Sequence, residues 1–156
     1  MINTKYLAPI FIFLTVVNLL ISPQTQASSN SRLIVQLNGL KNQKGQVCFS
    51  LFSSSQGFPT QGEKAVQSRC IQLGEADFKT TFENLIPGGY AVAVFHDANG
   101  DGLLNQNAFG IPTEGFGFSR NPKVLSGPPN FGESVVTVAP PQNNIQIHLQ
   151  YLLSWN

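Results

Sequence analysis

The sequence predicts an all-β fold, a single antiparallel β-sandwich of about seven strands. Apolar and polar residues alternate with a period of two along most of the chain from residue 33 onward, whereas almost no segment shows the period of a helix. Gly, Pro and Asn separate these segments, as they do where short strands are joined by turns. No internal repeat is visible, so residues 28–156 are expected to form one domain.

Each predicted strand is an alternating or wholly apolar segment. In 33–39 and 45–52 every second residue is apolar and shares one face, whereas 90–97 is apolar on both faces, as in a central strand. The start of 64–73 fits either a strand or one helical turn. The predicted strands are LIVQLNG (33–39), GQVCFSLF (45–52), KAVQSRCIQL (64–73), DFKTTFENL (77–85), YAVAVFHD (90–97), ESVVTVA (133–139) and NNIQIHLQYL (143–152).

The N-terminal segment predicts a secretory signal peptide at residues 1–27. Lys5 precedes an uncharged run, Tyr6–Ile21, and small polar residues follow it, with cleavage expected after Ala27. The run is short for a membrane span of about 20 residues, although an uncleaved anchor is the alternative. The mature chain is therefore expected to be periplasmic or extracellular, with no stable membrane span.

Two cysteines, Cys48 and Cys70, are both in the predicted mature chain. An even count in an exported protein predicts one disulfide, and two buried free thiols are the alternative. Cys48 lies on the opposite face from Val47 and Phe49, so the bond would join neighbouring strands on the outer side of the sandwich.

The charge of the chain bears on its partners. Nine basic and eight acidic residues give a net charge of +1, and the basic residues form no cluster. This balance argues against nucleic acid as a partner and against electrostatic attachment to a membrane. An envelope protein or a glycan is the expected partner.

Residues 103–133 show no clear strand pattern and are rich in Gly and Pro. The Phe side chains of this segment supply apolar surface that a disordered linker would lack, so one long ordered loop is expected across an end or face of the sandwich. Some of these Phe must anchor the loop, and its polar groups would face a partner. The candidate binding residues are Glu114, Phe116, Phe118, Arg120 and Lys123.

The segment after the predicted central strand, HDANGDGLLNQN, resembles a calcium loop. Asp97, Asn99, Asp101 and Gly102 match positions one, three, five and six of the EF-hand loop, and alternate short oxygen-bearing side chains on a tight turn can converge on calcium. Ala108 stands where the closing Glu is expected, so the site would be weak. The candidate ligands are Asp97, Asn99, Asp101, Leu103, Asn105 and Asn107. A turn without metal would use the same residues and is the alternative.

No catalytic motif of a serine hydrolase, zinc protease, P-loop or dinucleotide-binding enzyme is present. His96 is adjacent to Asp97, but neighbouring residues of a strand point to opposite faces, and His148 falls on the polar face of the last predicted strand. The acidic residues Asp97, Asp101, Glu114 and Glu133 could pair as in a glycosidase. A binding module is the leading hypothesis, and a structural accessory protein and a hydrolase are the alternatives.

A family resemblance follows from one long motif. It comprises Pro87-Gly88 before Tyr90, His96-Asp97, Asp101-Gly102, the run GIPTEGFGFS from Gly110, and GPPNF from Gly127. These features resemble the bacterial family called domain of unknown function 2141, whose members are small, exported and of unassigned activity. A shorter pattern, Phe82-x-x-Leu85-x-Pro87-Gly88-x-Tyr90, is similar to transthyretin-like sandwiches. The expected sandwich is thus immunoglobulin-like or transthyretin-like.

Overall fold

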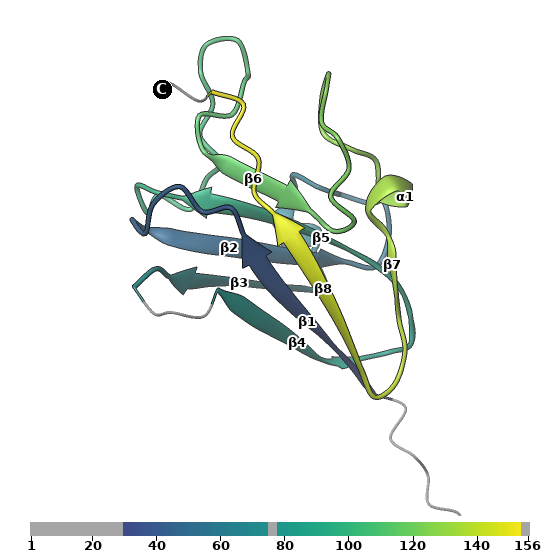
Figure 1. Ribbon diagram of the computed structural model, residues 1–156. Coiled ribbons are helices and arrows are strands. Elements are labelled where there is room, and N and C mark those ends of the chain that lie inside the picture. The colour runs from purple at the N-terminus through teal and green to yellow at the C-terminus, as the bar shows by residue number, and fades with distance from the viewer. Residues whose placement is uncertain (1–29, 75–77, 154–156) are drawn as a thin grey trace, which may run out of the picture.

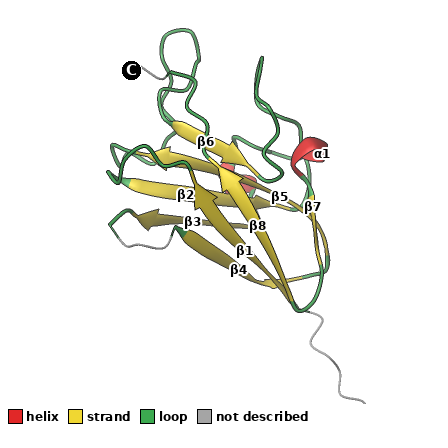
Figure 2. Ribbon diagram, in the orientation of Figure 1, coloured by secondary structure: helices red, strands yellow, loops and turns green. Residues whose placement is uncertain are grey.

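The computed structural model describes residues 30–74 and 78–153, which form two β-sheets stacked face to face (Figure 1). The predicted signal peptide and its cleavage site lie outside the described residues. Figure 2 shows that strands make up the body of the molecule and that helix is confined to short segments. The strands are β1 (Ser31–Asn38), β2 (Gln46–Phe52), β3 (Gln67–Gln72), β4 (Lys79–Leu85), β5 (Gly88–Asp97), β6 (Gly115–Phe118), β7 (Val136–Val138) and β8 (Gln142–His148).

The smaller sheet has the strand order β4-β1-β8, and the larger sheet has the order β3-β2-β5-β6, with β7 paired to the start of β5. The all-β sandwich is therefore confirmed. One pair departs from the antiparallel prediction, because β1 and β8 run parallel over seven residue pairs from Arg32 and Gln142 to Asn38 and His148. The first and last strands of the domain thus lie side by side, and alternation within a strand carries no signal of that pairing.

The core between the sheets contains residues of β1, β2 and β8 that were predicted to face inward, together with residues of the central strand β5. Leu33 and Val35 of β1, Leu51 of β2, Val92 of β5 and Ile147 of β8 have no exposed surface. Burial of each such side chain contributes about 1.5–3 kcal/mol to the free energy of unfolding. Strand β5 is buried on both faces along nearly its whole length, as predicted for the central strand.

A second apolar cluster covers the outer face of the larger sheet. Phe52, Phe116 and Phe118 are buried there. The ring of Phe58, from the loop after β2, lies 5.4 Å from Phe52 and 6.0 Å from Phe118 between ring centroids, and the ring of Phe131 packs against Phe58 at 5.9 Å. This cluster explains why β5 is apolar on both faces, because its outer face is covered by loops instead of solvent. The loops are ordered by side chains that they bury on the sheet.

The segment expected to be one long loop contains regular structure, which corrects that prediction. Strand β6 pairs with β5, with Phe118 opposite Ala93 and Gly115 opposite His96. Helix α1 (Phe131–Ser134) follows, and begins with a capping box in which Asn130 accepts the Glu133 N–H and Glu133 accepts the Asn130 N–H. What remains are two loops, 98–114 and 119–130, which project from the two ends of β6 (Figure 1).

The predicted strand 64–73 is divided in the structure. A 3-10 helix, η1 (Gly62–Lys64), occupies its start, and β3 begins only at Gln67, so both interpretations of this segment hold in part. Strand β3 places Cys70 directly opposite Cys48 of β2, and the two form the predicted disulfide between neighbouring strands. Within residues 30–74 and 78–153, no helix is long and apolar enough to cross a membrane.

Candidate functional site

Strand β5 ends at Asp97, whose side chain organises the following turn. Its Oδ1 accepts the N–H groups of Gly100 and Asp101 at 2.7 and 3.1 Å, and its Oδ2 accepts the N–H of Gly102 at 2.8 Å and the Gln46 Nε2 at 2.7 Å. Gly100 and Gly102 have φ angles of +76° and +81°, which a side chain would strain. The Asp97 carboxylate therefore gives the backbone N–H groups of the turn a fixed acceptor in place of water.

The environment of Asp97 favours its charged form. The residue has no exposed surface, and this burial raises the pKa of the carboxyl. The hydrogen bonds from Gln46, Gly102, Gly100 and Asp101 lower it by more, so the pKa lies below its ordinary value of 3.8. Asp97 is thus a charged anchor of the turn at neutral pH.

A second carboxylate, that of Asp101, lies on the exposed side of the turn. Its Oδ2 accepts the side-chain amides of Asn99 and Asn105 at 2.8 and 3.0 Å, and its Oδ1 accepts the N–H of Leu103 at 2.9 Å. The amide of Asn105, the N–H of Leu103 and the amide of Asn99 lower the pKa of Asp101. Five of the six predicted calcium ligands, all except Asn107, therefore belong to one network.

Asn107 lies apart from that network. Its Oδ1 accepts the N–H groups of Phe109 and Ile111 at 2.9 and 3.0 Å and so closes a turn of its own. The structure does not bring Asn107 to the predicted metal position. An Asn side chain that caps a local turn is a common alternative role for a residue with this spacing.

The residues present fit calcium only after a rearrangement. Asp97 is saturated, because a carboxylate has about four acceptor sites and protein donors occupy four here. Among the described residues, no three His, Cys, Asp or Glu side chains lie together as a metal would need. Asn99 and Asn105 turn amide nitrogens toward Asp101, so each would have to exchange its nitrogen for its oxygen before binding a cation.

Glu114 connects this turn to the start of β6. Its Oε1 accepts the N–H of Ala98 at 2.9 Å, and its Oε2 accepts the N–H of Asn105 at 3.0 Å. The carbonyl oxygen of Asn105 in turn accepts the backbone N–H and the hydroxyl of Thr113 at 2.9 and 3.1 Å. The half-buried Glu114, at the end of the loop 98–114, thus binds the start of this loop at Ala98 and its middle at Asn105, a role that the sequence did not indicate.

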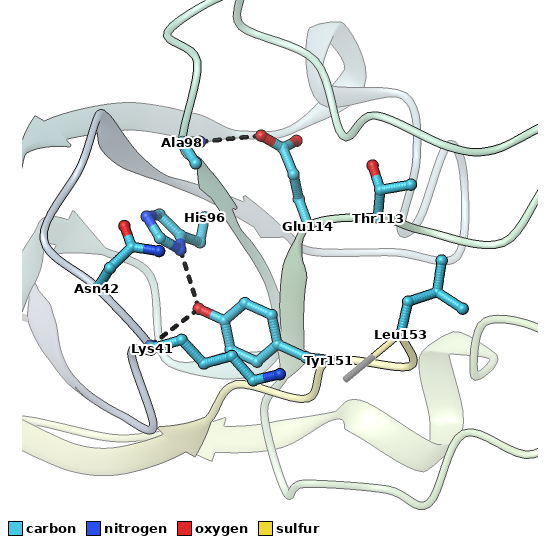
Figure 3. Close-up of a pocket in the computed structure, with 8 residues that line it drawn as sticks. All are labelled: Lys41, Asn42, His96, Ala98, Thr113, Glu114, Tyr151 and Leu153. Carbon is cyan, nitrogen blue, oxygen red and sulfur yellow. Dashed lines mark hydrogen bonds between the residues drawn. The ribbon is translucent and has the colours of Figure 1, made fainter. Parts of the chain in front are cut away.

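The same Glu114 lines a pocket of about 270 Å³ at this end of the sandwich (Figure 3). The pocket also receives Lys41 from the loop after β1, His96 from β5, and Tyr151 and Leu153 from the segment after β8. Segments that are distant in the sequence therefore meet at one place beside the Asp97 turn.

His96 and Tyr151 are held to each other in this pocket. The Nε2 of the buried His96 lies 2.8 Å from the carbonyl oxygen of Lys44, which can only accept, so Nε2 carries a proton. In the neutral ring Nδ1 then accepts the hydroxyl of Tyr151 at 2.9 Å. Burial raises the pKa of Tyr151 most, the N–H of Lys41 lowers it, and the negative charge of Glu114 raises it. Both ring nitrogens of His96 are thus engaged.

Lys41 and Gly115 enclose the ring of Tyr151. The Nζ of Lys41 lies 4.6 Å from the centre of the ring. A Cβ atom at position 115 would collide with the ring, so Gly115 allows Tyr151 to pack onto β6. The sequence placed Tyr151 inward by alternation, but no local pattern linked it to Lys41 or His96.

The predicted binding residues of 114–123 divide into two groups. Phe116 and Phe118 are 4% and 6% exposed, which corrects the prediction that they belong to a binding surface. The reason is that both point to the outer face of β6, which the loops cover. Arg120 and Lys123 are exposed, and Arg120 donates weakly to the carbonyl oxygen of Gly132 at 3.4 Å.

The His and acidic residues considered for an enzyme do not all meet at one place. His96 and Glu114 line one pocket, but the side chain of Asp97 turns to the opposite face of β5 and into its own hydrogen bonds. His148 is exposed on β8, as predicted. Glu133 is engaged in the capping box of α1.

The fold and this site define a two-sheet β domain with a polar, hydrogen-bonded loop site at one end. The sequence matches the family described as "Uncharacterized protein conserved in bacteria (DUF2141)" over residues 35–146, and the chain belongs to that family. The match includes the Asp97 turn and Glu114 and ends before Tyr151. We found no match among curated proteins or among solved structures.

Proposed function

We propose that the protein is an exported, non-enzymatic binding module of the cell envelope, whose binding site is the end of the sandwich formed by the Asp97 turn and the adjoining pocket. One observation carries this proposal. Glu114 accepts N–H groups from both ends of the turn and also lines the pocket, so the order of the loop and the shape of the pocket depend on one side chain. A partner is an envelope protein or a glycan, in keeping with the balanced charge of the chain.

We also propose that calcium stabilises this end of the sandwich by binding at the Asp97 turn. Rotation of the Asn99 and Asn105 amides would direct their oxygens to the place where their nitrogens now meet Asp101, and the carbonyl of Leu103 and water would add further ligands. With Asp97 retained as the anchor, the affinity would lie in the range of about 0.1–1 mM seen in extracellular modules. Such a site is occupied outside the cytoplasm.

The calcium test compares melting temperatures in about 10 mM calcium and in chelator for the wild type, Asp101→Ala and Glu63→Gln. Glu63 is an exposed acid in η1 and serves as the control for loss of one charge. The wild type and Glu63→Gln should be stabilised, by roughly 1–2 kcal/mol at ten times the dissociation constant. Asp101→Ala should show no shift. Equal melting temperatures of the wild type in both conditions would reject calcium and leave a turn without metal.

Binding at this end is tested separately by amide NMR spectra of the purified protein against a library of small polar molecules. Molecules that bind should displace the amide signals of Ala98, Asn105 and Thr113 and leave those of β4, at the far edge of the smaller sheet, unchanged. A library that moves none of these signals would contradict the binding role.

A structural accessory role is the second candidate, and the burial of Phe116 and Phe118 favours it. In that case the loops serve to cover the outer face of the larger sheet. Substitution of the exposed Lys41 and Asp101 at the proposed binding site by Ala would then leave the properties of the cell envelope unchanged, whereas loss of Phe118 would remove the folded protein.

A further inference from the structure

The pocket described above contains two opposite charges that are not paired with each other. The ammonium of Lys41 contacts the face of the Tyr151 ring, and the carboxylate of Glu114 accepts two backbone N–H groups. Within residues 30–74 and 78–153, neither group has an oppositely charged partner. Glu114 retains acceptor capacity, because each of its oxygens takes one hydrogen bond and can take two.

Both charges are arranged around the ring of Tyr151. Lys41 lies over its face, and the charge of Glu114 acts on its hydroxyl, whose pKa is raised first by burial and then by this carboxylate. Figure 3 shows the Glu114 carboxylate on one side of the pocket and the Lys41 ammonium beside the Tyr151 ring on the opposite side, with Leu153 at a third side. The hydroxyl itself is engaged with His96, so the two charges are the strongest recognition groups left.

The size of the pocket limits its occupant. A volume of about 270 Å³ is below the roughly 300–1,000 Å³ of sites for drug-sized ligands. A ligand with only a carboxylate would meet the repulsion of Glu114, and a ligand with only an ammonium would meet that of Lys41. A ligand with both groups can place its carboxylate at Lys41 and its ammonium at Glu114, so that both charge contacts are favourable.

We propose that this pocket binds a small zwitterion, a molecule with an ammonium and a carboxylate on neighbouring carbon atoms, whose ammonium meets Glu114 and whose carboxylate meets Lys41. The Tyr151 ring and Leu153 contact the carbon atoms between and beside the two charges. The inference rests on the proposed binding role and adds a small ligand, held in the pocket, to the protein or glycan partner proposed for this end of the sandwich.

The experiment is a titration of the purified protein with L-alanine, followed by amide NMR signals of Ala98, Thr113 and Leu153. Propionate and ethylamine, which each lack one of the two charged groups, are titrated in parallel. L-alanine should bind at least about tenfold more tightly than either, since each lost charge contact costs on the order of a factor of ten. Lys41→Met should weaken L-alanine binding by about tenfold and leave ethylamine binding unweakened.

Lys44→Met is the matched control, because Lys44 is in the same loop and contacts the site through backbone atoms, its carbonyl to His96 and its N–H to Asn42. It should bind L-alanine as the wild type does. Both lysines are exposed, so neither variant should prevent folding. Binding of propionate as tight as that of L-alanine, or an unchanged affinity of Lys41→Met, would overturn the proposal.

The two proposals fail in different ways. If the polar library displaces the pocket signals and L-alanine at about 10 mM does not, the ligand class is wrong and the binding role stands. If no compound displaces them, both are wrong.

Discussion

Asp97 is the residue on which the candidate site depends. It is buried, and its two oxygens accept four hydrogen bonds, three of them from the backbone of the turn that follows. No neutral side chain of similar size accepts four hydrogen bonds. Its role is thus to hold the turn, whether or not a cation binds beside it.

Asp97→Asn should lower the free energy of unfolding by about 2 kcal/mol, because its amide nitrogen would face backbone donors that then lack an acceptor. Urea denaturation measures the change. Asp101→Asn is the comparison, since Asp101 is exposed and its partners can reach water, and its effect should be clearly smaller. Equal effects of the two substitutions would contradict the anchoring role of Asp97.

The same carboxylate predicts a pH dependence. The folded-state pKa of Asp97 lies below the ordinary value of 3.8, so its stabilisation is fully present above that value and is lost as the pH falls through the lowered pKa. Melting temperatures from pH 7 downward should therefore drop more steeply below about pH 4 in the wild type than in Asp97→Asn. If the melting temperatures of the wild type and of Asp97→Asn fall in parallel with pH, Asp97 is not the group responsible for the loss of stability.

At the scale of elements, β6 requires small residues on its inner face. A Cβ at Gly117 would lie 2.7 Å from the Ile147 Cγ2 and 3.0 Å from the carbonyl oxygen of His148. Gly117→Ala should therefore lower the free energy of unfolding by about 1–3 kcal/mol, measured in urea. Gly88→Ala is the control, because its nearest atoms would be at 3.8 Å, and it should change stability much less. An unchanged free energy of unfolding for Gly117→Ala would contradict the close approach of β6 and β8.

The disulfide between β2 and β3 gives a second prediction for the elements. Cys48 and Cys70 are 22 residues apart, and reduction should lower the free energy of unfolding by about 3 kcal/mol because the unfolded chain gains freedom. Urea midpoints with and without reductant measure this. A Cys48→Ala/Cys70→Ala variant should be insensitive to reductant, and the denatured wild type should contain no free thiol. Two reactive thiols would reject the bond in the natural protein.

The elements also show what the sequence could predict. Alternation identified the inner faces of β1, β2 and β8 because burial between two sheets selects every second residue. Strand β6 was missed because Gly115 and Gly117 carry no side chain, so an inner face that is filled by Tyr151 and Ile147 leaves no apolar pattern. Helix α1 was missed although Asn130 and Glu133 have the spacing of a capping box.

At the scale of the whole molecule, the candidate site is assembled by long-range contacts. The Asp97 turn is local in sequence, and five of its six predicted residues do meet. The pocket is not local, since Lys41 and Tyr151 are brought to His96 by the parallel pairing of β1 and β8, which no periodicity encodes. A sequence alone therefore indicated the turn and not the pocket beside it.

Protease resistance should follow from the anchoring of the loops. The loop 119–130 begins after the buried Phe118 and ends before the partly buried Phe131, and Asn121 exchanges hydrogen bonds with β8 through Gln146 and His148. Trypsin should therefore cut slowly after Arg120 and Lys123 in the folded protein, as followed by mass spectrometry. Rapid cleavage there while the remaining domain stays folded would show that this loop is not held.

The most direct test of the account is hydrogen exchange at the amides that Asp97 and Glu114 accept. If the two carboxylates hold the end of the sandwich as an ordered binding site, the N–H groups of Gly100, Gly102, Ala98 and Asn105 exchange slowly in the wild type. Asp97→Asn then releases the protection of Gly100 and Gly102 while β1 and β5 remain protected. Exchange of all four amides at the rate of an unfolded chain in the wild type would contradict the account.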